Sequence, residues 1–368
     1  MSATEMVRQW QQNVKSNLLP TLHGHQAKAL ALFSWTMALA GSCRAGTIAS
    51  LAPAGKAKPA SVRRRLERLL ANGRLDAVAA MLQLTRSLTR DWGGIGIGRR
   101  LLLILDETPK GEQLRCMRLS VAYHKRTVTL LSICYPPQHP PMPMPKLVRW
   151  MLRQTAACLP QDVMVTLLAD RGLCWPTLIR QCRRLGWHYL LRLQSDTRVR
   201  LADGTVRSAV ELAPPRRGGG TGWFGTDVRV FKKARWLKAN VVAVWEEPCK
   251  EPWLLVTDER ASYACCRGYC KRSWCEESHR DEKSHGLNWQ LSQVNDPDHA
   301  QRLVLLMALA TLLCIATGAT AIKRGLRRRW FEPRLRRLNS VFQLGKRCLE
   351  YAVTHEQPLV PLPALPPP

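Results

Sequence analysis

The apolar positions of the chain follow one spacing up to about residue 92 and another beyond residue 100. In the first part they recur every three or four residues, as in residues 26–41 and 61–88, which is the period of an amphipathic helix. Beyond residue 100, compact apolar runs of strand length alternate with helical stretches. The pattern therefore predicts an all-α N-terminal domain over residues 1–92 and an α/β fold after it.

The first part of the α/β region, residues 100–195, contains five predicted strands and two predicted helices. The second and third strands follow each other closely, which indicates an antiparallel pair. The predicted strands cover residues 101–107, 114–125, 127–135, 162–170 and 188–194, and the predicted helices cover residues 146–159 and 174–186. Their order, β-β-β-α-β-α-β, predicts a mixed sheet with helices packed on it.

Residues 196–258 have the composition of a β insertion. Short apolar runs at residues 227–233, 240–245 and 253–259 are separated by turn residues, among them Asp203, Gly204 and the glycines Gly218, Gly219 and Gly220. An unrelated β-hairpin domain would give the same pattern. The core then resumes over residues 259–322. The three glycines Gly94, Gly96 and Gly98 precede a strand and do not lead from a strand into a helix, so they predict a linker and not a dinucleotide-binding loop.

An uncharged run of nineteen residues, Leu303 to Ala321, is long enough to cross a bilayer. It is rich in Ala and Thr and stands alone, which favours a core helix or a subunit contact over a transmembrane span. A basic helical segment over residues 323–358 follows, with eight Lys or Arg in residues 323–337 that suit phosphate contact. The tail, residues 359–368, is proline-rich and predicts an extended conformation.

The net charge of +29 indicates a polyanionic partner. Nucleic acid is the simplest such partner, and an anionic membrane surface is the rival. The N-terminus has no apolar signal core behind a basic start, so we expect a cytoplasmic, nucleoid-associated protein with reduced cysteines. Four of the thirteen cysteines, Cys265, Cys266, Cys270 and Cys275, lie near His279 and raise the question of zinc. They include no CxxC pair, and Cys270 and Cys275 would lie about 140° apart on a helix, which disfavours a closed site.

The segment from Thr47 to Leu70 is similar to a helix-turn-helix. A short helix is followed by a turn containing Pro53, Gly55 and Pro59, and a second helix is predicted to open at Ser61. Three basic residues begin this second helix: Arg63, Arg64 and Arg65. We expect them to contact DNA in the major groove, although an ordinary solvated helix pair would show the same pattern.

Three acidic residues stand out among the strand and helix patterns. Asp106 and Asp170 each end an apolar run, and Glu276 belongs to the pattern Y-x2-R-x3-E-x6-K with Tyr269, Arg272 and Lys283. If residues 263–283 form one α-helix, the four motif residues fall within a sector of about 60°, while Glu277 lies about 100° further round. This geometry selects Glu276 over its neighbour.

The motif and the two aspartate segments, LLLILDET and VMVTLLADRG, resemble those of bacterial transposases of the DDE type, specifically insertion-sequence family four. The resemblance extends from about residue 100 to the end of the chain. It implies a ribonuclease H-like catalytic domain in which the first and fourth strands are neighbours. It also implies that Asp106, Asp170 and Glu276 hold two Mg²⁺ ions, with Mn²⁺ as a substitute, for cut-and-paste transposition.

The resemblance further implies that Tyr269, Arg272 and Lys283 contact the transposon end. On that basis, loss of Arg272 or Lys283 would weaken DNA binding and leave metal affinity intact. The implied partners are double-stranded DNA, as terminal inverted repeats and target, and a second copy of the chain in a paired-end complex without a membrane. We expect the dimer contact at Leu303–Ala321 and after Asn339; the alternative is that both helices close the core of one subunit. The alternative function is a catalytically inactive, transposase-derived DNA-binding regulator.

Overall fold

The computed structural model describes residues 1–92, 100–215, 222–245, 249–332 and 338–357. Several features named above lie outside these residues. They are the linker glycines Gly94, Gly96 and Gly98, the turn glycines Gly218, Gly219 and Gly220, residues 333–337 of the basic run, and the proline-rich tail.

Ten strands form one continuous sheet in the order β3-β2-β1-β4-β5-β10-β9-β8-β6-β7. The strands are β1 Arg100–Lys110, β2 Leu114–Tyr123, β3 Arg126–Tyr135, β4 Met164–Ala169, β5 His188–Arg192, β6 Arg198–Arg200, β7 Val206–Ser208, β8 Trp223–Val230, β9 Leu237–Val244 and β10 Trp253–Thr257. β1 runs parallel to β4 and β4 parallel to β5, whereas β1, β2 and β3 are antiparallel. The predicted neighbourhood of the first and fourth strands is therefore confirmed.

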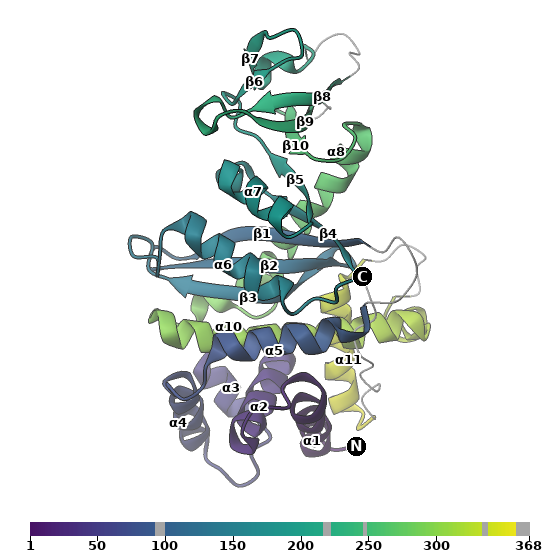
Figure 1. The fold of residues 1–368 in the computed structure, drawn as a ribbon. Coiled ribbons are helices and arrows are strands. Elements are labelled where there is room, and N and C mark those ends of the chain that lie inside the picture. The colour runs from purple at the N-terminus through teal and green to yellow at the C-terminus, as the bar shows by residue number, and fades with distance from the viewer. Residues whose placement is uncertain (93–99, 216–221, 246–248, 333–337, 358–368) are drawn as a thin grey trace.

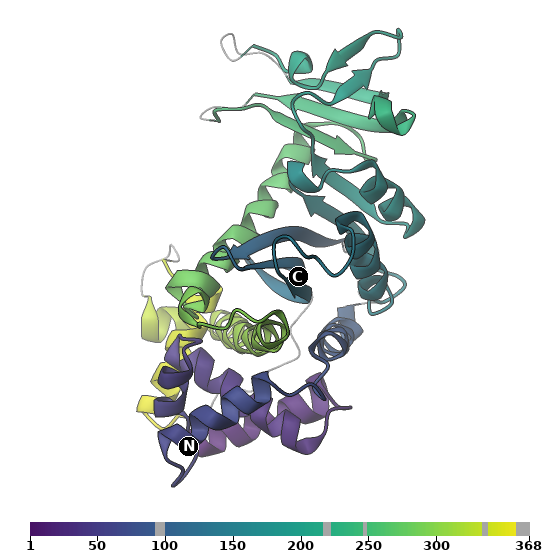
Figure 2. The ribbon, with the colours of Figure 1, turned by 90° about the vertical axis from the view of Figure 1, so that its left-hand side faces the viewer.

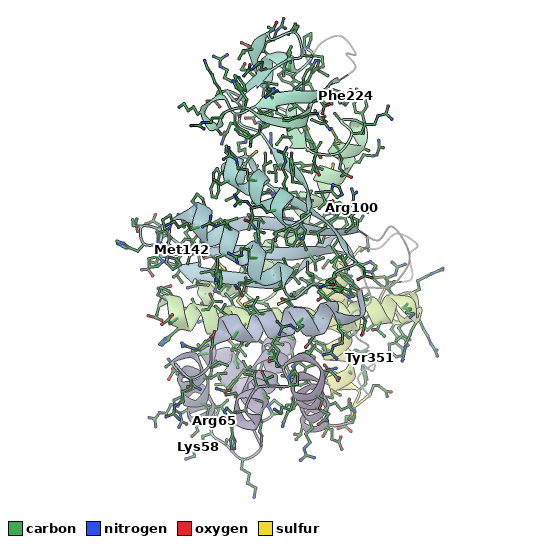
Figure 3. The ribbon with its side chains drawn as sticks, viewed as in Figure 1. Lys58, Arg65, Arg100, Met142, Phe224 and Tyr351 are labelled. Atoms are coloured by element: carbon green, nitrogen blue, oxygen red, sulfur yellow. The ribbon has the colours of Figure 1, made fainter. Side chains whose placement is uncertain are left out.

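The predicted β insertion extends this sheet. β10 pairs antiparallel with β5, and β9, β8, β6 and β7 follow outward. The insertion therefore lies at the end of the molecule opposite the N-terminal helices (Figure 1). Arg100, at the start of β1 (Figure 3), forms an ion pair with Glu259 beyond β10 at 2.6 Å. The insertion is thus joined to the first five strands by backbone pairing, because its last strand returns beside β5.

The two faces of the sheet are covered by different helices (Figure 2). On one side lie α6 Met144–Ala156 and α7 Pro176–Arg184, and on the other lie α8 Tyr263–Tyr269 and α9 Trp274–Arg280. Leu103 and Leu105 of β1 belong to the larger core, whereas Ile104 between them packs with Cys266 and Tyr269 of α8. This alternation follows from the two-residue period of a strand. Even-numbered positions of β1 therefore face α8 and α9.

The N-terminal region consists of helices that share the larger core with the sheet. They are α1 Ala3–Asn13, α2 Gly24–Ala40, α3 Ala45–Leu51, α4 Pro59–Leu70 and α5 Ala77–Thr89, with a π-helical turn at Val14–Leu18 and a 3-10 turn at Arg90–Trp92. The helix predicted to open at Ser61 begins at Pro59, whose fixed φ suits a first helical position. Short 3-10 turns elsewhere cover Arg171–Leu173, Val210–Leu212, Lys232–Ala234 and Trp289–Leu291.

The uncharged run forms most of α10, Pro297–Lys323. This helix is long and apolar enough to cross a membrane. However, 94% of an apolar 18-residue stretch of the helix is buried inside the protein. It runs beside the edge strand β3 and α5, with α2 and α4 on its other sides (Figure 1). The apolar character of α10 is accounted for by this surrounding core.

The C-terminal helix α11, Val341–Thr354, packs on α10 within the same chain. The expected dimer contact at Leu303–Ala321 is therefore wrong, because α10 is covered by its own subunit and offers no free apolar face there. The contact between the two helices is close. A Cβ atom on Gly345 would lie 1.7 Å from the carbonyl oxygen of Cys314, and one on Gly318 would lie 2.0 Å from that of Val341.

We predict that Gly345→Ala destabilises the protein by about 1 to 3 kcal/mol, because the added methyl forces the two helices apart. In an uncrowded helix the same change is usually stabilising, by up to about 1 kcal/mol. Gly46→Ala in α3 is the matched control, since a Cβ atom there has no neighbour within 4 Å. The measurement is the midpoint of urea unfolding, and equal midpoints for the two variants would contradict the close packing.

Candidate active site

Strand pairing brings the two predicted aspartates together. Leu105 of β1 lies opposite Ala169 of β4, and this pair is the last of the β1–β4 pairing, so Asp106 and Asp170 each follow it directly. Asp170 lies just beyond β4, whereas β1 continues past Asp106 to Lys110 in its pairing with β2. Asp106 shares the face of Ile104, and Asp170 that of Leu168, which both pack in the smaller core under α8 and α9. The two carboxylates therefore emerge side by side on the face covered by the motif helix.

Residues 263–283 are helical, but the single regular α-helix assumed from the sequence is not formed. α8 is followed by a 3-10 turn at Cys270–Ser273, then by α9, then by a π-helical turn at Asp281–His285. A 3-10 turn winds more tightly than an α-helix and a π turn more loosely. The single 60° sector is therefore distorted, yet Arg272 and Glu276 still face the two aspartates.

Arg272 lies at the centre of the three predicted carboxylates. Its Nη2 donates to Asp106 Oδ1 at 2.6 Å and lies 3.9 Å from Asp170 Oδ2, and its Nη1 donates to Glu276 Oε1. The Arg272 side chain is only 15% exposed. The pair with Glu276 is an i,i+4 contact, but Arg272 is buried among acids and does not lie on an exposed helix face.

The electrostatics of Asp106 show why this group of carboxylates needs a cation. Burial raises the pKa of Asp106, and the charges of Glu276 and Asp170 raise it further, while Arg272 opposes the shift. Three acids from different parts of the chain, all with oxygen ligands, are the donor set that Mg²⁺ prefers. The guanidinium of Arg272 supplies positive charge at that place, so the residues present fit a divalent cation.

The other two motif residues have different surroundings. The Tyr269 ring is buried against Trp253, and its hydroxyl donates to the carbonyl oxygen of Ala169 at 3.2 Å, directly before Asp170. The predicted DNA contact of Tyr269 stays a prediction, since this hydroxyl has a protein partner here. Lys283 lies in the π turn, where burial and the nearby charge of Arg118 lower its pKa. Within the described residues Lys283 forms no ion pair.

A buried ion pair anchors the end of the motif helix to the sheet. Arg118, which lies opposite Asp106 in the β1–β2 pairing, contacts Glu282, and their side chains are 3% and 5% exposed. Arg118 also stacks over the ring of Trp289 at 5.1 Å. Removing one member of such a pair typically costs about 3 to 5 kcal/mol, because it leaves an uncompensated buried charge. This pair therefore helps to hold the C-terminal end of α9 against the sheet near Asp106.

Two residues that the sequence did not select lie beside Asp106. Cys275 and His279 of α9 and the Asp106 carboxylate offer ligand atoms that all lie within 4.8 Å of one another. His279 Nδ1 is 3.5 Å from Asp106 Oδ2. Their i,i+4 spacing was the available signal, since such residues share a helix face. The structure groups Cys275 with Asp106, and not with the other cysteines of its segment.

A basic surface lies at the end of the molecule opposite the β insertion, on α4 and the residue before it. Lys58, the N-cap residue of α4, and Arg65 of α4 lie at the lower end of Figure 3. Arg64 is exposed, and Arg63 is exposed and pairs with Glu67 at 2.8 Å. α3 and α4 contact each other across the turn that the sequence predicted. The arrangement presents a short basic helix to solvent, as a helix-turn-helix would.

No curated protein matches the sequence, but a protein family does. Residues 105–313 match the family described as "Transposase DDE domain", and this span begins one residue before Asp106 and contains Asp170, the motif helix and most of α10. The match covers more than half of the 368 residues. The chain therefore belongs to the family of transposases with a DDE domain.

Proposed function

We propose that this transposase cuts DNA at the ends of an insertion sequence and joins them to a target, in the manner of insertion-sequence family four. The observation that carries the proposal is the convergence of Asp106, Asp170 and Glu276 on one guanidinium, from strand β1, the end of β4 and helix α9. Three acids held together at an energetic cost are typical of a site that binds cations. An inactive DNA-binding regulator would not need this group of acids.

Asp106, Asp170 and Glu276 would hold two Mg²⁺ ions, or Mn²⁺ in their place. When bound, the ions would activate water or a DNA 3′-hydroxyl and stabilise the departing oxygen. Asp106 and Asp170 are positioned by strand pairing, and Glu276, with a side chain 58% exposed, comes from α9. Asp106 and Asp170 thus supply oxygen ligands from the ends of the β1–β4 pairing, and Glu276 supplies a more exposed oxygen ligand from the helix.

Arg272 has two successive partners in this scheme. In the DNA-free protein its guanidinium neutralises the carboxylates. Once cations take over that task, the planar guanidinium becomes free to make a two-point contact with a phosphate next to the scissile bond. Lys283, which carries no ion pair among the described residues, supplies a second positive charge for the same strand. The family resemblance implied that loss of Arg272 would leave metal affinity intact. The contacts of Arg272 with the carboxylates lead us to propose instead that its loss raises that affinity.

Two surfaces are suited to hold the rest of the DNA. The basic helix α4, with Arg63, Arg64 and Arg65, is proposed to contact a terminal repeat. The exposed residues Lys323, Arg324, Arg328 and Arg329 at the end of α10 add a second cluster of positive charge. We further propose a dimer on paired ends, formed through a surface other than α10, in a cytoplasmic, nucleoid-associated protein.

We predict that Asp106→Asn, Asp170→Asn and Glu276→Gln each reduce Mg²⁺-dependent cleavage by more than about 100-fold, because each removes a ligand charge where the reaction develops charge. The substrate is DNA from both flanks of the gene's native locus, followed by end labelling. Glu277→Gln is the control, since Glu277 pairs with Arg126 and Arg280 and not with the aspartates. Absence of cleavage by the unaltered protein, or full cleavage by Asp170→Asn, would support the regulator.

We predict that Arg272→Ala raises the Mg²⁺ affinity of the DNA-free protein by at least about tenfold, because a neighbouring arginine shifts carboxylate equilibria by one to three pKa units. The same variant should bind cleaved DNA ends more weakly. Calorimetric titration with Mg²⁺ measures the first effect and gel retardation the second. Arg280→Ala, an exposed arginine of α9, is the control. Unchanged or weaker Mg²⁺ binding by Arg272→Ala would show that the guanidinium does not compete with cations.

We predict that Arg64→Ala lowers DNA affinity and reduces the slope of log affinity against log salt concentration by about 0.9, the value for one lost phosphate contact. Arg153→Ala, an exposed arginine of α6, should leave the slope unchanged. The measurement is fluorescence anisotropy with end DNA over a range of salt concentrations. Identical slopes for Arg64→Ala and the unaltered protein would remove α4 from the DNA interface.

A further inference from the structure

Asp106, Cys275 and His279 form a group of metal-ligating side chains that includes a sulfur and a nitrogen, whereas Asp106, Asp170 and Glu276 offer oxygen atoms alone. The Asp106 and Cys275 residues are 9% and 2% exposed, and the His279 side chain is 12% exposed. One ligand comes from β1 and two come from one face of α9, at i and i+4. Two helical ligands at this spacing, joined by a third from another element, are a recurrent way of holding Zn²⁺.

The atoms offered are one sulfur, one imidazole nitrogen and one carboxylate oxygen. Zn²⁺ binds this mixture, whereas Mg²⁺ requires oxygen ligands. Ligand atoms around a tetrahedral Zn²⁺ lie roughly 3.4 Å apart, given bonds of about 2.0 to 2.3 Å. All three atoms here already lie within 4.8 Å of one another. Small side-chain rotations therefore bring them to bonding positions, with a fourth position left open.

The protonation states of the two helix residues set how such an ion would bind. Burial and the charges of Arg118, Lys283 and Arg272 keep the pKa of His279 well below its usual range, so its imidazole is neutral and able to coordinate a metal. Burial and the charge of Asp106 raise the pKa of Cys275 to about 12. The thiol must therefore release its proton to the buffer when the S–metal bond forms.

The two oxygens of Asp106 face different partners. Oδ1 accepts a hydrogen bond from Arg272, on the side of Asp170 and Glu276, and Oδ2 lies nearest His279. An ion on Oδ2 can therefore coexist with Arg272 on Oδ1. Catalytic Mg²⁺, in contrast, needs the side of Asp106 that Arg272 occupies.

We propose that Asp106, Cys275 and His279 form an inhibitory site for Zn²⁺, which holds Asp106 in the Arg272-bound arrangement and so keeps its Oδ1 from binding Mg²⁺. The inhibitory consequence rests on the proposed function, but the binding site itself does not. A divalent transition metal thereby blocks the enzyme at its first aspartate, without occupying the place of Mg²⁺.

The first test is direct binding of Co²⁺, used as the spectroscopic substitute for Zn²⁺, to the full-length, metal-free protein. We expect one equivalent to bind with a thiolate-to-cobalt absorption band and with release of one proton. Added Zn²⁺ should abolish the band. Cys275→Ser should eliminate it, and His279→Asn should weaken Co²⁺ binding at least tenfold. Circular dichroism establishes whether each variant is folded, and either folded variant suffices for the test.

Two control variants separate this site from its neighbours. Cys270→Ser removes the exposed cysteine of the same helical segment and should leave the band unchanged. Glu276→Gln alters the catalytic carboxylates alone and should also leave it unchanged. A band that survives Cys275→Ser, or that disappears in Glu276→Gln, overturns the proposal, as does the absence of any band in the unaltered protein.

The second test concerns inhibition and is read as the ratio of DNA cleavage with and without Zn²⁺ at saturating Mg²⁺. We expect micromolar Zn²⁺ to reduce cleavage by the unaltered protein at least tenfold, and Cys275→Ser to bring the ratio close to one. If the protein cleaves no DNA at all, the proposed function fails, while the cobalt titration still decides the metal site. Cobalt binding without any effect of Zn²⁺ on cleavage overturns the inhibitory role.

Discussion

The need to bury α10 on every side organises this protein. The helix carries an uncharged run of nineteen residues, Leu303 to Ala321, and an apolar surface of this length cannot remain in water. The edge strand β3, the helices α2, α4 and α5, and the C-terminal helix α11 each cover part of it. The N-terminal helices and the sheet consequently share one continuous core. The basic helix α4 and the sheet that carries the candidate active site are thus held in one body by an apolar helix.

On the far side of the sheet the governing constraint is electrostatic. Strand pairing places Asp106 beside Asp170, and α9 brings Glu276 to them, so like charges gather in a partly buried place. Such a group is stable only with compensating positive charge. Arg272 provides that charge in the DNA-free protein, from the same helical segment that carries Glu276. The negative charge of the group is therefore compensated within the chain itself.

The surroundings of Asp106 differ between its two carboxylate oxygens, which is the basis of the two roles proposed for it. Its Oδ1 faces hard oxygen ligands and a guanidinium, and its Oδ2 faces the imidazole of His279. The buried pair Arg118–Glu282 helps to hold the C-terminal end of α9 against the sheet. The Arg118–Glu282 pair thus contributes to the positions of the residues on both sides of Asp106: Arg272 and Glu276 on one side, and Cys275 and His279 on the other.

The element order, the position of Asp106 and Asp170 at the ends of apolar runs, the spacing of Tyr269, Arg272, Glu276 and Lys283, and the basic character of the chain can be read from the sequence. These are local properties, because periodicity and spacing are read within one segment at a time. Three further features follow from the packing of the whole chain: α10 is covered within one subunit, Arg272 lies among the acids, and Cys275 and His279 meet Asp106. Arg272 and Asp106 are 166 positions apart, so their contact depends on strand register and on how α9 is seated over the sheet. No pattern within a single segment contains that information, since it arises from the joint packing of all the elements between them.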